Sequence, residues 1–201
     1  MRSDPLAVRI TTPVVDSAPG RGFYQLEESA LYVPIGTGDK TRHYFSSLES
    51  DRVRLDIDRD GRLMFLEIAA ARNTWNVIDR IELPVWAEPA DVRFLGFRTT
   101  IPDPEILTDR SRRKLLLRFS LAPVSRIVSL GDGILMSVND HGSTTSILVC
   151  DIVDDLAGRE IARFRTQLRE RDPCYSSTIL NSLGAPQVAD RIPVRPVKSR
   201  D

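Results

Sequence analysis

The chain of 201 residues is long enough for one domain or for two modules of about 100 residues each. Its 28 basic residues equal its 28 acidic residues, so no net charge attracts it to nucleic acid, and its 41% hydrophobic content argues against a disordered chain. No stretch approaches the roughly 18 apolar residues of a membrane span, and the start lacks the apolar core of a signal peptide, which predicts a cytoplasmic protein without membrane contact.

Short β-rich runs dominate the chain and predict a mostly antiparallel β fold. Clusters of Gly, Asp, Asn and Ser separate them, as turns separate strands. We expect strands within residues 6–11, 30–36, 52–58, 62–68, 92–98, 114–120, 125–130, 133–139 and 145–153. Apolar and charged residues alternate strictly in 52–58, so we expect Leu55 and Ile57 to face the core and Asp56 and Asp58 to face water.

One amphipathic helix is expected near the C-terminal end of the fold. Apolar residues recur there at helical spacing, namely Leu156, Ile161, Phe164 and Leu168. Pro173 follows the last turn and ends the pattern. Residues 173–201 are polar and punctuated by proline, which predicts an extended or partly disordered tail that contacts a partner.

The two halves of the chain repeat the same features in the same order. The matches are Arg9, Thr11 and Pro13 with Arg98, Thr100 and Pro102, residues 31–36 with 115–120, and residues 53–68 with 134–149. We infer a tandem duplication. The predicted fold is therefore α+β and predominantly antiparallel β, with two tandem β-rich modules related by pseudo-twofold symmetry, a C-terminal helix and an extended tail. The predicted boundaries are 1–90, 91–172 and 173–201.

Residues 56–67 match the EF-hand calcium pattern in every position. The candidate ligands are Asp56, Asp58, Asp60 and Glu67, with Gly61 at the turn. An EF-hand needs a helix on each side, whereas these flanks alternate with strand period around an Asp-Gly pair, which is typical of a hairpin. The matching segment of the second half also lacks the ligand set. We therefore interpret the segment as a polar hairpin turn and expect no cofactor, with calcium as the alternative.

Residues 24–35, YQLEESALYVPI, and residues 53–68 resemble the DUF2283 family of short bacterial domains of unknown function. That family opens with Tyr, an acidic spacer and Ala-Leu-Tyr-Ile, and closes with an acidic Asp-Gly turn and a strand ending in Glu-Ile. The second module fits only in outline, with Leu148 where the first has Glu67. The resemblance implies a small β-rich unit without known enzymatic activity, and some members look like partners of toxin-like neighbours.

Nucleophilic catalysis finds little support in the sequence. Cys150 lies in an apolar run, where a thiol keeps a high pKa and stays inert. Cys174 lies in the predicted tail, and whether the two cysteines ever pair stays open. No serine has the G-x-S-x-G context of an exposed nucleophile. We therefore lean against an enzyme and name no catalytic residue.

Three functional hypotheses follow. The first is a non-enzymatic binding protein that acts through protein–protein contacts or self-association, as an assembly unit or a toxin-neutralising partner. The second is a small-ligand-binding protein or enzyme with a pocket between the modules, lined by Arg42, His43, Tyr44, Glu67 and His141. The third is nucleic-acid binding through the basic helix, with Arg159, Arg163 and Arg169. The sequence leaves the partner, the oligomeric state and the biological process open.

Overall fold

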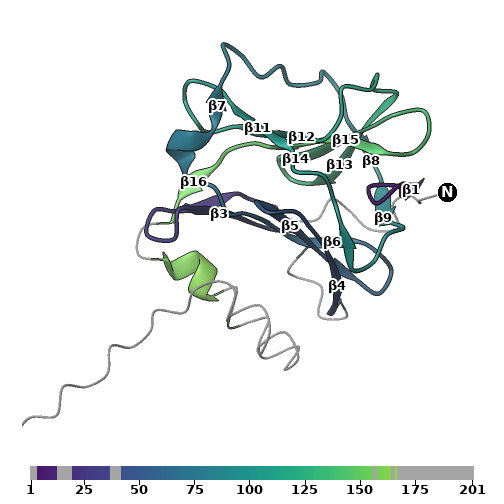
Figure 1. The fold of residues 1–201 in the computed structure, drawn as a ribbon, viewed down its shortest axis with the longest axis horizontal. Helices are drawn as coiled ribbons and strands as arrows, with labels where there is room; N and C mark the ends of the chain where they lie inside the picture. Colours follow the sequence, from purple (N-terminus) through teal and green to yellow (C-terminus); the bar gives the residue numbers. More distant parts are fainter. Residues whose placement is uncertain (1–3, 13–19, 37–41, 156–157, 164–165, 167–201) are drawn as a thin grey trace, which may run out of the picture.

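The computed structural model describes residues 4–12, 20–36, 42–155, 158–163 and 166. These residues form two seven-stranded sheets that lie one above the other, and a two-stranded sheet lies at one end (Figure 1). The inner strands of both large sheets pair antiparallel, which confirms the predicted β-rich, mostly antiparallel fold. Each of the predicted runs overlaps a strand.

The first sheet has the strand order β10-β4-β5-β6-β3-β2-β16. Its inner strands are β2 (Phe23–Gln25), β3 (Ala30–Pro34), β4 (Tyr44–Glu49), β5 (Val53–Asp58) and β6 (Leu63–Ile68). Its edges are two-residue parallel strands from later in the chain, β10 (Thr99–Thr100) and β16 (Val153–Asp154). Such short edges offer little backbone for pairing with another chain.

The second sheet has the order β7-β11-β12-β15-β14-β13-β8. Its inner strands are β11 (Glu105–Thr108), β12 (Leu115–Arg118), β13 (Arg126–Gly131), β14 (Ile134–Val138) and β15 (Thr144–Val149). Its parallel edges are β7 (Asn76–Val77) and β8 (Glu88–Pro89), which come from the first half of the chain. The edge strands of each sheet therefore come from the opposite side of the boundary predicted at residue 90.

The facing sides of the two sheets share one hydrophobic core. Leu55 and Ile57 lie in it, as predicted, and Leu117 and Met136 reach it from the second sheet. All four side chains are completely buried. Burying an aliphatic side chain of this size stabilises the fold by about 1.5–3 kcal/mol. The core thus holds the two sheets together as layers.

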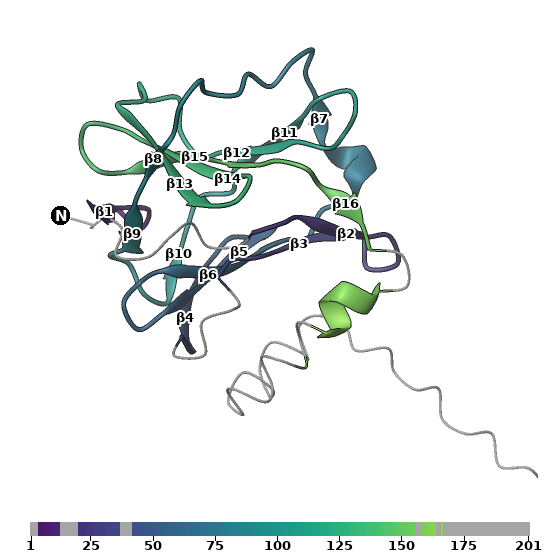
Figure 2. The ribbon, with the colours of Figure 1, turned by 180° about the vertical axis from the view of Figure 1, so that it is seen from behind.

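A small two-stranded sheet joins the layers at one end (Figure 2). Strand β1 (Val8–Thr11) pairs antiparallel with β9 (Asp91–Phe94). The Val8 N–H donates to the Gly142 carbonyl at the β14–β15 turn (2.8 Å), and the Phe94 N–H donates to the Gly61 carbonyl at the β5–β6 turn (2.8 Å). Both glycines have a positive φ, +82° at Gly61 and +75° at Gly142, which other residues adopt only with strain.

The Arg-x-Thr match of the two halves does not hold in the fold. Arg9 and Thr11 lie on β1, which is antiparallel to β9. Thr100 lies instead on β10, which is parallel to β4. The two segments therefore have different partners and different directions, so the match is a coincidence of composition.

The outer face of the first sheet is covered, contrary to the prediction that it faces water. Tyr32 and Phe65 stack there with ring centroids 5.9 Å apart, and Ile161 of the C-terminal helix packs in the same cluster. Asp56 and Asp58 lie on this face and are only 1% and 5% exposed. Strand periodicity separates the two faces correctly, but it does not reveal what covers the second one.

The helix begins after β16, and its described helical residues are 159–163 and 166. The Asp155 carboxylate accepts hydrogen bonds from the backbone N–H groups of Glu160 (3.2 Å) and Ile161 (3.1 Å), which lack partners inside the helix. Ile161 is buried, as the helical pattern predicts. Leu156, Phe164, Leu168 and the predicted tail 173–201 lie outside the described residues. Within the described part of the chain, no helix has the length and apolar character needed to cross a membrane.

Candidate functional site

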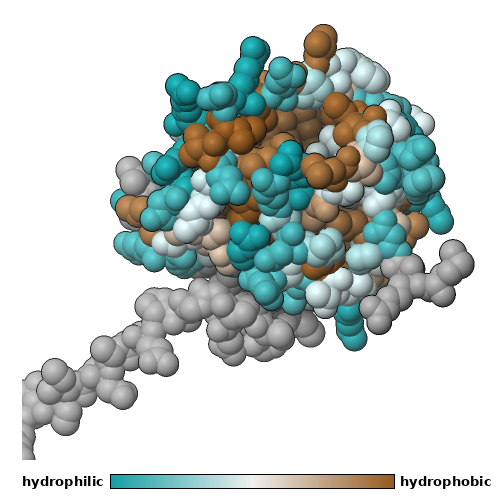
Figure 3. Space-filling view, turned by 45° about the horizontal axis from the view of Figure 1, so that its top comes forward, coloured by the Kyte–Doolittle hydropathy of each residue, from teal (hydrophilic) through white to brown (hydrophobic). Residues whose placement is uncertain are grey.

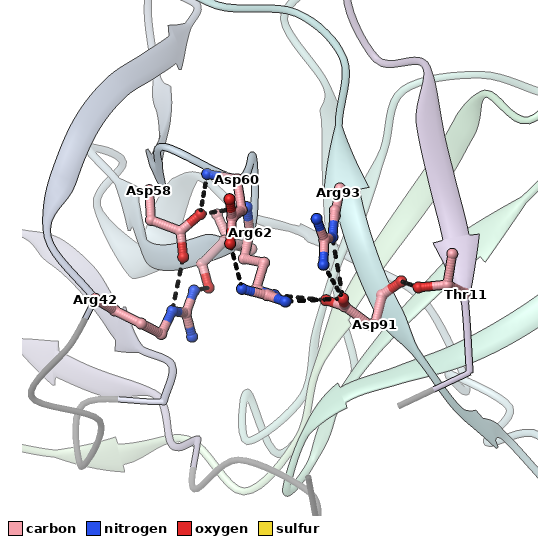
Figure 4. Close-up of polar contacts among 8 residues, drawn as sticks. Thr11, Arg42, Asp58, Asp60, Arg62, Asp91 and Arg93 are labelled. Atoms are coloured by element: carbon pink, nitrogen blue, oxygen red, sulfur yellow. Dashed lines mark hydrogen bonds and ion pairs between the residues drawn. The ribbon is translucent and has the colours of Figure 1, made fainter. Parts of the chain in front are cut away.

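The calcium-like segment forms a β-hairpin. Strand β5 precedes its turn and β6 follows it, whereas an EF-hand loop lies between helices. The Asp58 carboxylate accepts hydrogen bonds from the backbone N–H groups of Asp60 (3.0 Å) and Arg62 (2.9 Å) and from Arg42 Nε (2.9 Å) (Figure 4). These donors engage both carboxylate oxygens that a calcium ion would need.

The other candidate calcium ligands lie beside arginines. Asp60 pairs with Arg62 (2.7 Å) and Asp56 with Arg54 (2.8 Å), while Glu67 is the register neighbour of Arg54. Burial lowers the pKa of Arg54, but the charge and hydrogen bond of Asp56 raise it above its ordinary value. Among the described residues, His, Cys, Asp and Glu form no group of three or more that could hold a metal ion.

An arginine–aspartate cluster joins the hairpin to β9 (Figure 4). Arg62 donates to both carboxylate oxygens of Asp91, at 2.7 and 3.0 Å, and Arg93 donates two further bonds, at 3.0 and 2.8 Å. The hydrogen bond from Arg62 lowers the pKa of Asp91, burial opposes it, and Arg93 lowers it further. Paired guanidinium–carboxylate bonds fix geometry as well as charge. The cluster is therefore a structural joint between the first sheet and the end strands.

The predicted ligand-binding residues lie in two places. Arg42, Tyr44 and Glu67 lie on the outer side of the first sheet, and His43 is exposed beside Tyr44. His141 lies at the β14–β15 turn of the second sheet and is exposed. A pocket lies at the ends of β2 and β16, and none of these five residues lines it.

Two of the predicted nucleic-acid-binding arginines belong to the described part of the C-terminal helix. Arg159 and Arg163 are exposed there, and Arg169 lies outside the described residues. Exposed Glu160 lies directly beside Arg159 and reduces the local positive charge. A phosphate backbone is bound most strongly by clustered cations, so the described part of this helix offers only a weak attraction.

A pocket of about 500 Å³ lies where β2 meets β16. Its wall comes from β2 and the turn that follows it, residues 71–73 at the 3-10 helix η1 (Arg72–Thr74), Arg112 of the β11–β12 turn, and Asp154, Asp155 and Gly158. This volume falls in the range of about 300–1,000 Å³ that small-ligand sites occupy. No sequence pattern predicts the pocket, because four separate segments line it.

Arg72 forms the rigid part of the pocket wall. Its guanidinium carbon lies 4.2 Å from the ring centroid of Tyr24, and its Nη2 lies 2.6 Å from Asp154 Oδ1. The Arg72 backbone N–H donates to Tyr24 Oη (2.9 Å), and Trp75 meets the Tyr24 ring edge to face at 5.5 Å. A cation over an aromatic face contributes about 0.5–2 kcal/mol. These contacts hold both side chains in fixed positions.

Two turn residues of the pocket have a strained backbone. Ser29 has φ +52° and Arg112 has φ +54°, a region that costs a non-glycine residue about 1–2 kcal/mol. The Ser29 N–H donates to the Leu26 carbonyl (3.2 Å), and the Arg112 N–H donates to the Asp109 carbonyl (3.0 Å). The pocket therefore lies between two turns of the same kind, one from each large sheet. Strained backbone of this sort is found preferentially at functional sites.

A row of leucines crosses the outer face of the second sheet. Leu107, Leu116, Leu148 and Leu135 are register neighbours on β11, β12, β15 and β14. They alternate along their strands with residues of the main core and therefore point away from it. We call these four residues the leucine row.

Residues 78–87, which we call the strap, cross this outer face from β7 at one edge to β8 at the other (Figure 1). Ile81 is buried, whereas Leu83 is about half exposed, Trp86 is 69% exposed and Val85 is fully exposed. Figure 3 brings this side of the molecule forward and shows apolar groups among the polar ones. The strap and the leucine row, of which Leu107 and Leu148 are buried, together form what we call the apolar surface.

Cys150 follows β15 directly and is half-buried. Burial raises the pKa of its thiol, in the direction that the sequence analysis predicts. Cys174 lies outside the described residues.

No family model matches the chain, and no curated protein matches its sequence.

Proposed function

We propose that the chain is a non-enzymatic binding protein that acts through protein–protein contacts, with the apolar surface as its contact face. The observation that carries the proposal is the exposure of the strap, where Val85 is fully exposed and Trp86 is 69% exposed. Large apolar side chains gathered on one face mark interaction sites, and tryptophan is enriched among residues that dominate binding energy.

The charges around this face favour a second copy of the chain as the partner. Arg118 pairs with Glu105 on the outer face of the second sheet, and Arg110 pairs with Asp79 of the strap. Because these charges are already balanced, two copies of the face can meet without like-charge repulsion, as a twofold-symmetric dimer requires. The zero net charge of the whole chain acts in the same direction. The proposed role is therefore an assembly unit.

We also propose that the two halves of the chain arose by tandem duplication. They would then be homologous modules related by pseudo-twofold symmetry. The strand order supports this origin. The first sheet contains the order β4-β5-β6-β3-β2, and the second contains the corresponding order β13-β14-β15-β12-β11. Asp58 Oδ1 accepts from the backbone N–H groups two and four residues later (3.0 and 2.9 Å), and Asn139 Oδ1 does the same (3.0 and 2.9 Å). Leu148 then takes the position of Glu67, so the second module buries a leucine where the first buries a charge.

Sedimentation equilibrium tests the assembly. The wild type is expected to show a mass that rises with concentration toward that of a dimer, because association buries the strap. The double variant Val85→Glu, Trp86→Glu is expected to stay monomeric, since two carboxylates would be desolvated at the interface. Leu26→Glu is the matched control, because Leu26 is equally exposed but lies outside the apolar surface. A wild type that remains monomeric at every concentration contradicts the proposed assembly.

The resemblance of residues 24–35 to DUF2283 motivates a second form of the same function. In this form the apolar surface binds and neutralises a toxin-like protein in the bacterial cytoplasm. Growth rescue during co-expression with a neighbouring toxin-like gene, lost in the Val85→Glu, Trp86→Glu variant, would favour it over self-assembly. Rescue that survives this double change would exclude the apolar surface as the site of neutralisation.

A further inference from the structure

We propose that the pocket at the ends of β2 and β16 binds a small carboxylate whose neighbouring carbon carries an N–H donor. A free amino acid has this chemistry, and so has the last residue of a peptide. This site lies in a different part of the molecule from the apolar surface and does not depend on the proposed assembly. It does share Asp155 and Gly158 with the start of the C-terminal helix.

Two buried polar atoms of the pocket wall lack hydrogen-bond partners. They are Gln25 Oε1, which is an acceptor, and Arg72 Nε, which is a donor. Gln25 is only 9% exposed, so bulk water does not satisfy its oxygen. Native structures leave few buried polar groups unpaired, and each one calls for a missing partner. A ligand that satisfies both atoms must donate to Gln25 and accept from Arg72.

Arg112 adds a positive charge to the same pocket. It forms no ion pair with the described residues, whereas Arg72 already shares its charge with Asp154. The strained φ of Arg112 would disappear with glycine at this position, so the arginine carries a cost to stability here. A guanidinium binds a planar carboxylate through two parallel hydrogen bonds. Arg112 is therefore the expected anchor of the ligand's carboxylate.

The rest of the wall suits an amino-acid side chain. Leu26 and Ala71 present apolar surface, and the pocket volume of about 500 Å³ admits a ligand of roughly one to three residues. Exposed Glu27 is a further acceptor for an ammonium group. Inorganic phosphate would pair with Arg112 but offers a poor donor to Gln25. A single water would satisfy Gln25 and Arg72 but would leave Arg112 without a partner.

Isothermal titration calorimetry with three sets of probes tests this inference. The probes are the free amino acids, the same amino acids N-acetylated, and the N-acetylated amino-acid amides, which lack the carboxylate. We expect saturable binding of probes with a carboxylate and no binding of the amides. Binding of the N-acetyl forms as tightly as the free forms identifies the peptide end as the source, and preference for the free forms identifies the amino acid.

Three variants locate the binding. Arg112→Gly folds without strain at φ +54° and is expected to weaken binding by at least roughly tenfold, since a charge-assisted pair is lost. Gln25→Leu keeps the volume of the buried side chain and is expected to weaken binding comparably. Arg110→Gln is the matched control, because Arg110 lies on the same turn but outside the pocket wall, and it should bind like the wild type.

Four results would overturn the inference. They are the absence of saturable binding by any carboxylate, equal binding of amides and carboxylates, undiminished binding by Arg112→Gly, and undiminished binding by Gln25→Leu. Thermal melting of both variants shows whether they remain folded. A crystal structure grown with saturating probe that shows only an ordered water between Gln25 and Arg72 would also reject it.

Discussion

Gly61→Ala is expected to destabilise the fold far more than Gly142→Ala, although both glycines lie at matching hairpin turns. Both have a positive φ, so alanine is strained at either position by about 1–2 kcal/mol. At Gly142 the new Cβ would lie 3.4 Å from the Val8 carbonyl oxygen, which is a tight but ordinary contact. At Gly61 it would lie 2.3 Å from the Phe94 carbonyl oxygen, a backbone atom that no side-chain rotation moves away.

Strand β9 must therefore shift away from the β5–β6 turn in the Gly61→Ala variant. Overpacking of this kind costs about 1–3 kcal/mol, and loss of the hydrogen bond from the Phe94 N–H to the Gly61 carbonyl adds about 1 kcal/mol. We expect a loss of about 1–2 kcal/mol for Gly142→Ala and about 3–6 kcal/mol for Gly61→Ala. At about 2–4 °C per kcal/mol, the two melting temperatures separate clearly.

Urea unfolding followed by circular dichroism measures this difference. Equal slopes against urea for both variants and the wild type would show that only the stability of the native state has changed. Equal losses for Gly61→Ala and Gly142→Ala would refute the reasoning, because strain in the turns alone predicts equality. A large difference instead locates the cost at the contact between the turn and β9.

Three further predictions concern Asp91, the calcium-like hairpin and Cys150. The pKa of Asp91 is lowered in the folded state, so its carboxylate stabilises the fold at pH values above its unfolded pKa of about 3.9, and this contribution is lost as the pH falls through the lower folded pKa. Asp91→Asn should therefore flatten the acid side of the curve of stability against pH, and an unchanged curve would contradict this. Calcium is expected to give no saturable rise in melting temperature, because Arg42 and backbone N–H groups engage Asp58, and a saturable rise would restore the calcium site. A Cys174→Ser variant leaves Cys150 as the one thiol of the chain. Because burial raises the pKa of Cys150, this thiol should react with a disulfide reagent more slowly in the native protein than in urea. Equal rates would show that the Cys150 thiol is accessible in the native protein.

Strand patterns in the sequence predict the layers of the fold well and their surroundings poorly. Alternation in residues 53–58 places Leu55 and Ile57 in the core, and the Asp-Gly pair predicts the hairpin correctly. The same alternation assigns Asp56 to water, because a strand pattern contains no information about the helix and aromatic side chains that cover the outer face. Two-residue edge strands such as β7 and β16 are too short to carry any period, so the exchange of edges between the sheets has no sequence signal.

The pocket and the apolar surface show the same limit at the level of function. Tyr24 belongs to the family-like opening and Arg112 to a basic run, so neither pattern connects one with the other. The fold brings their two turns to one pocket, together with Arg72 and the parallel pair of β16 and β2. The leucine row is likewise spread over four strands that are adjacent in space and not in sequence. Sites assembled across sheets therefore require the register, which the sequence patterns do not supply.

Iodide quenching of Trp86 fluorescence, measured across protein concentrations, tests most directly whether the strap is a contact face. Trp75 is buried, so the difference between the wild type and Trp86→Phe isolates the signal of Trp86. If the apolar surface mediates assembly, iodide should quench Trp86 strongly in dilute protein and progressively less as the concentration rises. Quenching of Trp86 that stays strong and constant over the whole range would contradict the proposed contact.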